Sequence, residues 1–104
     1  MATAADFRRI ALSLPGTSEA PHFHRAAFKL ARIYATTDGT SANLLLTRDE
    51  QDFKCLLAPD IFAPIPNKWG EKGWTLVTLA AASAEELQAV LHLAWANAGP
   101  KKKR

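Results

Sequence analysis

The chain has 104 residues, of which 48% are hydrophobic and 22% are charged. This length fits one folded domain and is too short for two, because a chain of this size buries roughly two thirds of its unfolded surface in a single core. No apolar run approaches the ~20 residues that a membrane span needs, and arginines interrupt the first apolar stretch, so we expect neither a membrane segment nor a signal peptide.

The net charge of +3 comes from the end of the chain. Four of the thirteen basic residues fall in residues 101–104, which leaves nine basic and ten acidic residues in residues 1–100. We therefore expect one domain over residues 1–98 and a basic tail over residues 99–104, and terminal clusters of this kind are usually solvated. Cys55 is the only cysteine, so no intramolecular disulfide can form, which fits a cytoplasmic protein.

Apolar periodicity predicts a first helix that ends at Pro15-Gly16. One face of this helix contains Phe7, Ile10, Ala11 and Leu14. Alternating and β-branched residues then predict four strands, with Asp38-Gly39 as the hairpin turn between the last two. These strands are expected at residues 20–24, 26–30, 32–37 and 41–46.

Two capping boxes predict where the later helices begin, because in each box a hydroxyl and a carboxylate satisfy free backbone N–H groups. Thr47 with Glu50 begins the first of these helices, and Ser83 with Glu86 begins the last, which ends at Gly99-Pro100. The apolar side of the helix after Thr47 is expected to contain Phe53, Leu56 and Leu57.

The segment "DIFAPIPNKWGEKG" between these helices is rich in proline and glycine and predicts an ordered loop, followed by a strand at "WTLVTL". The order of elements is then α-β-β-β-β-α-β-α. This order predicts an α+β fold, with a mostly antiparallel sheet of four to five strands and helices packed on one face.

The stretch "PNKWGEKGWTLV" places Trp69 and Trp74 around Lys68 and Lys72. Aromatic rings offer stacking surfaces and lysines meet phosphates, which is the composition of a site for nucleic acid or another anionic ligand. The alternative is that both tryptophans anchor the loop by packing. The residues alone favour packing, with Trp69 the more exposed of the two.

A second group of basic residues lies on the early strands. Arg25 and Lys29 share one face of a regular strand, and Arg32 follows shortly afterwards. This group is either a basic stripe on the open side of the sheet or a charged edge that prevents sheet-to-sheet pairing.

Few residues suggest catalysis or metal binding. His22 and His24 would project to the same face of a strand, but two imidazoles are too few for a metal site unless Cys55, His92 or a carboxylate adds a third ligand. Surface or hydrogen-bonded histidines are the favoured interpretation. Cys55 lies among apolar residues of a helix, which favours an inert thiol over a nucleophile. We therefore expect no enzyme activity and no cofactor.

Several short motifs together resemble one family of small bacterial proteins. They are "PHF" at residues 21–23, "AF" at 27–28, "IYA" at 33–35 and "WGEKGW" at 69–74. In this combination, over residues 7–95, the chain resembles the YjbR/MmcQ-like family. The resemblance implies an α+β fold of the CyaY-like, double-wing type and a role in DNA binding.

The chain departs from that family's pattern at two positions. In "LARIYA" it lacks the glycine that is common in the turn before the third strand, and His24 stands where glycine or aspartate often follows "HF". The fold type also resembles frataxin-like iron binders, but their first helix is acidic, and Asp6 with Arg8 and Arg9 does not match it.

Two functions follow from the sequence. The leading hypothesis is a non-enzymatic DNA-binding protein of the cytoplasm, with the basic tail assisting the nucleic-acid-binding residues Arg25, Lys29, Arg32, Lys68 and Lys72. The alternative is a binding module for a small anionic molecule or a protein partner, which predicts a concave, partly apolar site at the tryptophans. Its ligand-binding residues would be His22, Phe23, Trp69 and Trp74.

Overall fold

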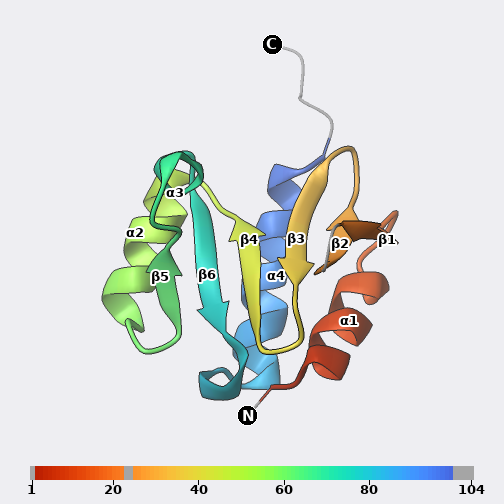
Figure 1. Ribbon diagram of the computed structural model, residues 1–104, viewed down its shortest axis with the longest axis horizontal. Helices are drawn as coiled ribbons and strands as arrows, with labels where there is room; N and C mark the ends of the chain where they lie inside the picture. The colour runs from red at the N-terminus through yellow and green to blue at the C-terminus, as the bar shows by residue number, and fades with distance from the viewer. Residues whose placement is uncertain (1, 23–24, 100–104) are drawn as a thin grey trace.

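The computed structural model describes residues 2–22 and 25–99 of the chain. Its helices are α1 Ala4–Ser13, α2 Arg48–Leu57, α3 Lys68–Glu71 and α4 Ala84–Asn97, with a 3-10 turn, η1, at Leu79–Ala81. Its strands are β1 Ser18–His22, β2 Arg25–Lys29, β3 Ile33–Thr37, β4 Ser41–Leu45, β5 Phe62–Pro64 and β6 Trp74–Thr78 (Figure 1). Among the described residues, no helix is long and apolar enough to cross a membrane.

The described strands form one sheet of six in the order β1-β2-β3-β4-β6-β5, and all neighbouring pairs are antiparallel. The expected α+β class is confirmed, but the sheet has more than the expected four to five strands. The extra strand, β5, lies in the segment that the sequence predicts as a loop. Pro64 fits there because β5 is an edge strand, which needs a backbone donor on one side only.

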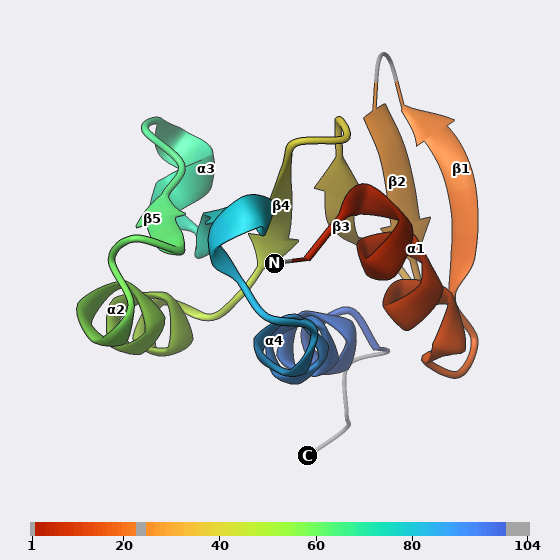
Figure 2. The ribbon, with the colours of Figure 1, turned by 90° about the horizontal axis from the view of Figure 1, so that it is seen from below.

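Helices α1 and α4 pack together and cover one face of the sheet (Figure 2). Phe7 of α1 meets Phe28 of β2 edge to face, with ring centroids 5.6 Å apart, and α4 adds four fully buried side chains. These are Leu87, Val90, Leu91 and Ala94. The core therefore lies between this helical layer and the sheet, and the other face of the central strands remains available for a site.

A β-bulge in β3 determines which side chains reach that other face. Phe28 pairs with Ala35 but Lys29 pairs with Ile33, so Tyr34 has no partner in β2. The Tyr34 hydroxyl instead donates to the Ala11 carbonyl oxygen of α1 at 3.3 Å, and burial raises the pKa of this tyrosine. Because the bulge adds one residue, Tyr34 and Ala35 are both buried while Ile33 emerges on the open face.

The turn between β2 and β3 closes without a glycine. The Leu30 N–H donates to the Arg32 carbonyl oxygen at 3.1 Å, and the Ala31 N–H donates to the Ala98 carbonyl oxygen at 3.1 Å. Nη2 of Arg32 also donates to the Asn97 carbonyl oxygen at 2.9 Å. The end of α4 therefore fixes both this turn and the Arg32 side chain.

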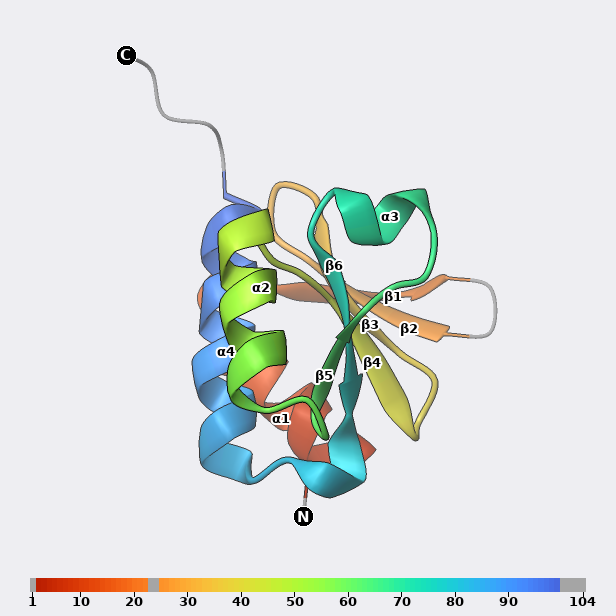
Figure 3. The same cartoon turned by 90° about the vertical axis from the view of Figure 1, so that its left-hand side faces the viewer.

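Helix α2 corrects one expectation of the sequence. Phe53, Leu56 and Leu57, expected on its apolar side, are 61%, 85% and 66% exposed, whereas Gln51 is only 2% exposed. The capping box of Thr47 is present as expected, so the helix begins where the sequence places it. It lies beside the edge strand β5 (Figure 3) and buries Gln51 in place of these apolar side chains, which periodicity alone does not reveal.

Candidate functional site

The segment "WGEKGW" forms the single-turn helix α3 and the start of β6. Asn67 caps α3 by accepting the Trp69 N–H at its Oδ1, at 2.8 Å. A Cβ atom at Gly70 would collide with the Ile65 carbonyl, and one at Gly73, which has a φ of 104°, would collide with the Leu46 carbonyl. Both glycines are therefore required for the backbone to fold this closely.

Gln51 of α2 fixes this segment by two hydrogen bonds. Its Nε2 donates to the Gly70 carbonyl oxygen at 3.0 Å and to the Trp74 carbonyl oxygen at 2.9 Å. One buried amide on α2 thus fixes both ends of the segment, and with them the positions of Trp69 and Trp74. This role is not predictable from the sequence, because a glutamine in a charged helix gives no signal of burial.

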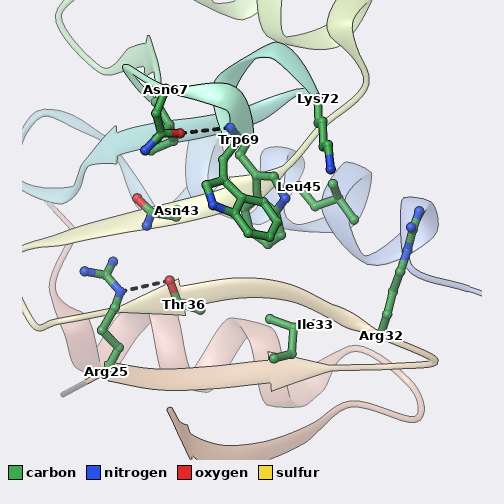
Figure 4. Close-up of a pocket in the computed structure, with 11 residues that line it drawn as sticks. Arg25, Arg32, Ile33, Thr36, Asn43, Leu45, Asn67, Trp69 and Lys72 are labelled. Carbon is green, nitrogen blue, oxygen red and sulfur yellow. Dashed lines mark hydrogen bonds between the residues drawn. The ribbon is translucent and has the colours of Figure 1, made fainter. Parts of the chain in front are cut away.

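Helix α3 lies on the side of β6 opposite to α2 and α4 (Figure 3). Beneath it, on the open face of β2, β3, β4 and β6, is a pocket of about 750 Å³ (Figure 4). We call this concavity the sheet pocket. Its apolar lining consists of Ile33, Leu45, Ile65, Trp69 and Trp74. Its polar lining consists of Arg25, Arg32, Thr36, Asn43, Asn67 and Lys72.

The two tryptophans differ in role: one packs against the core, and the other is exposed to a ligand. Their rings meet edge to face, with centroids 6.3 Å apart and planes at 84°. Trp74 is half-buried and packs against the core, which makes it an anchor. Trp69 remains 58% exposed at the pocket, although α3 is well fixed, so its indole is available to a ligand.

Among the residues that the structure describes, three cations and no carboxylate line the sheet pocket. Lys72 Nζ lies 5.4 Å from the Trp69 ring centroid, and the Lys72 and Arg32 side chains approach the same end of the pocket from α3 and from the β2–β3 turn (Figure 4). Arg25 lies at the other end. An environment of this kind attracts anions, because low-dielectric walls strengthen the local field of like charges.

Arg25 is held in place by polar contacts on one side. Its Nε donates to Thr36 Oγ1 at 2.9 Å, and its Nη1 lies 3.5 Å from Asp38 Oδ2. Backbone N–H groups of Ser41 and Thr40 lower the pKa of Asp38 to about 2, so this carboxylate stays charged at neutral pH. Nη2 of Arg25 is buried and has no hydrogen-bond partner in the described part of the chain.

Most of the residues in the two predicted sets come together in this one pocket. Arg25, Arg32 and Lys72 of the DNA-binding set share it with both tryptophans of the ligand set. Lys29 and Lys68 are exposed and do not line it.

The predicted residues not yet placed are His22, Phe23, His24 and the basic tail. His22 ends β1, where its backbone pairs with Arg25. Phe23, His24 and the end of the basic tail, residues 100–104, fall outside the described residues.

The described structure offers little for the metal and thiol alternatives. Across residues 2–22 and 25–99, no group of three potential metal-ligating side chains comes together. Burial, and to a lesser extent the charge of Asp52, raises the pKa of Cys55. A nucleophilic cysteine needs the opposite shift, because the thiolate is the reactive form.

An antiparallel sheet with helices on one face and a cationic, aromatic pocket on the other defines this chain as an α+β domain. It belongs to the YjbR family, whose family model matches residues 12–97. A crystal structure of the Deinococcus radiodurans protein DR2400, which has the family domain DUF419, is similar with a TM-score of 0.72. The two chains are 26% identical, and the match covers 90% of this chain and 76% of that one. None of the curated proteins matches significantly.

Proposed function

We propose that this domain binds DNA at the sheet pocket and acts in the cytoplasm without catalysing a reaction. The observation that supports the proposal most is that the described part of the lining pairs an exposed indole, Trp69, with three cations and no carboxylate. Proteins that bind nucleic-acid strands combine stacking surfaces with positive charge in this way. Within residues 2–22 and 25–99, the lining has no thiol, imidazole or carboxylate group, the groups that usually act as nucleophile, acid or base.

The charge of the whole domain argues for a local site rather than a broad basic face. Residues 1–100 have a net charge of −1, so attraction to phosphates must come from the cluster of Arg25, Arg32 and Lys72. The basic tail adds four more charges beyond this cluster. We propose that the tail assists by contacting phosphates outside the pocket.

Salt dependence tests this proposal directly. Arg25 is paired with Asp38, which leaves Arg32 and Lys72 to neutralise one or two phosphates. The logarithm of the binding constant should then fall against the logarithm of salt concentration with a slope of about −1 to −2. The slope should be steeper for the full chain than for a chain ending at Pro100. Arg32→Ala should reduce its magnitude by about 0.7 to 0.9. The measurement is DNA binding by fluorescence anisotropy across a salt series.

The same binding measurements on the full chain, the shortened chain and Arg32→Ala can contradict the proposal. If neither chain binds single-stranded or duplex DNA at about 50 mM salt, where such contacts are strong, the proposal fails. If only the full chain binds, and Arg32→Ala leaves its slope unchanged, the tail alone is responsible and the pocket is not the site. Lys29→Ala, an exposed cation outside the lining, is the matched control.

A second candidate function is the binding of a small anionic molecule or a protein partner. The concave shape of the sheet pocket favours it, since about 750 Å³ lies within the usual range for small-molecule sites. Titration with such a ligand would change the tryptophan fluorescence up to a plateau. The ligand would remain bound when DNA is added in excess. Displacement of the ligand by DNA would instead place both in the same pocket.

A further inference from the structure

We infer that the sheet pocket accepts one unpaired nucleotide, with its base stacked on Trp69, and that it prefers a keto base, thymine or guanine. The inference rests on the proposed function and narrows it from DNA in general to an exposed base of a single strand. Three parts of the pocket support it: the exposed indole, the polar groups at one end and the two cations at the other.

The exposed indole favours an unpaired base over a duplex. Trp69 is 58% exposed but lies within a concave lining, below the level of α3 (Figure 4). In a duplex each base is covered by its neighbours, so only the outer phosphates could reach the rim of a pocket of this kind. An unpaired base can enter and stack on the indole, as bases do in other proteins that bind single strands.

The polar end of the pocket supplies mainly hydrogen-bond donors. Asn67 Oδ1 is occupied by the Trp69 N–H, which leaves the Asn67 amide N–H groups free. Thr36 Oγ1 already accepts from Arg25 Nε, so its hydroxyl proton remains to donate. Arg25 Nη2 adds a buried donor without a partner in the described residues.

Asn43 completes this end with both a donor and an acceptor. Its side-chain amide makes no hydrogen bond within the described part of the chain, and it points into the pocket beside Asn67 (Figure 4). Its amide can pair with the ring N–H and carbonyl of thymine or guanine, and equally with the amino group and ring nitrogen of adenine or cytosine, so Asn43 holds a base without selecting it. The remaining donors can then meet further acceptors of thymine and guanine.

Adenine and cytosine match this end less well. Both present an amino group where thymine and guanine present a carbonyl oxygen. That amino group would face the N–H groups of Asn67 and Arg25, donor against donor. Stacking alone does not distinguish bases, so the polar end is where we expect the preference to arise.

The opposite end of the pocket fits a phosphate. Arg32 and Lys72 reach it from separate elements, and the Asn97 carbonyl fixes one guanidinium nitrogen of Arg32 while leaving its other N–H groups available. Charge-assisted hydrogen bonds from two such groups are among the strongest that proteins make to phosphate. Base and phosphate would thus occupy the two ends of one site, with the indole between them.

The test compares short labelled oligonucleotides on the full chain at one salt concentration: oligo-dT, oligo-dA and a duplex hairpin, with dTMP as competitor. We expect oligo-dT to bind about tenfold more tightly than oligo-dA or the hairpin, the size of one well-matched base contact. Asn67→Asp, which keeps the oxygen that caps α3 but replaces the amide donors by an acceptor, should bring the ratio of dT to dA affinity to one or below. Asn43→Ala should weaken both oligonucleotides alike, because its amide can pair with either kind of base.

Lys54→Ala is the matched control, since Lys54 lies on α2 and outside the lining, and it should leave the ratio unchanged. Equal affinity for oligo-dA and oligo-dT in the unaltered protein overturns the keto preference. A hairpin that binds as tightly as oligo-dT overturns the single-nucleotide pocket and leaves DNA binding intact. Absence of binding to any DNA overturns both proposals. If dTMP binds as tightly as oligo-dT, the nucleotide pocket stands, but a free nucleotide replaces DNA as its ligand.

Discussion

Gly73→Ala is expected to destabilise the domain by about 3 kcal/mol, because it combines a strained backbone with a collision that cannot relax easily. Gly73 has a φ of 104°, and a Cβ atom there would meet the Leu46 carbonyl at the end of β4. To relieve the contact, β4 and β6 would have to separate where Trp74 begins the strand. Thermal denaturation should report the loss, with a midpoint temperature lower by about 15 °C.

Gly39→Ala separates the two causes. Gly39 has nearly the same backbone angle, a φ of 105°, but no atom lies within 4 Å of where its Cβ would be. This variant should therefore lose only the cost of backbone strain, about 1 kcal/mol. If both variants lose the same stability, the close approach of Gly73 to β4 contributes nothing, and the account of how the segment is placed is wrong.

Gln51→Met is expected to cost about 2 kcal/mol, because it removes two hydrogen bonds from a buried side chain while preserving its length. The Gly70 and Trp74 carbonyls would lose their contacts with α2, and the segment between them would loosen. We therefore expect a change in tryptophan emission and weaker ligand binding as well as lower stability. Urea denaturation and fluorescence of the same samples measure both.

Gln88→Met makes the same chemical change on the exposed side of α4. It should alter stability by less than about 0.5 kcal/mol, as most surface substitutions do. The role assigned to Gln51 is contradicted if its variant matches the Gln88 variant in stability and emission. A stability loss without any change at the tryptophans would limit Gln51 to a packing role.

Local sequence rules predicted the parts of the fold that local interactions determine. The capping boxes at Thr47 and Ser83 are both present. The turn at Asp38-Gly39 joins β3 to β4, with Gly39 at positive φ. A third box, in which Thr3 pairs with Asp6, was also readable but was missed. Such signals need only a few neighbouring residues, which is why they survive without knowledge of the fold.

Elements that depend on distant partners were harder to predict. Strand β5 has only three residues and includes Pro64, so it exists as a strand because β6 pairs with it. The buried side of α2 depends on which edge of the sheet it packs against, and the periodicity of Phe53 and Leu56 suggested the wrong side. In each case tertiary contacts override a local pattern.

The candidate site was anticipated as two competing sets of residues rather than as one pocket. Basic residues on the early strands and the tryptophan segment are about forty positions apart, and only the sheet order brings β2 and β3 near α3. Asn43 was missed because a lone polar residue in an apolar strand has no distinctive spacing. Its place in the pocket depends on the pairing of β3 with β4, which puts Asn43 on the open face of the sheet.

The indole N–H signals of the three tryptophans offer the most direct test of the central proposal, that DNA is bound at the sheet pocket. Trp69 and Trp74 line the pocket, whereas Trp95 donates its indole N–H to the Pro15 carbonyl oxygen, at 2.8 Å, outside the lining. When oligo-dT is titrated into the labelled chain, two-dimensional NMR should show the Trp69 and Trp74 signals shifting together to saturation while Trp95 stays in place. Saturable binding that leaves the Trp69 and Trp74 signals unmoved would contradict the proposal.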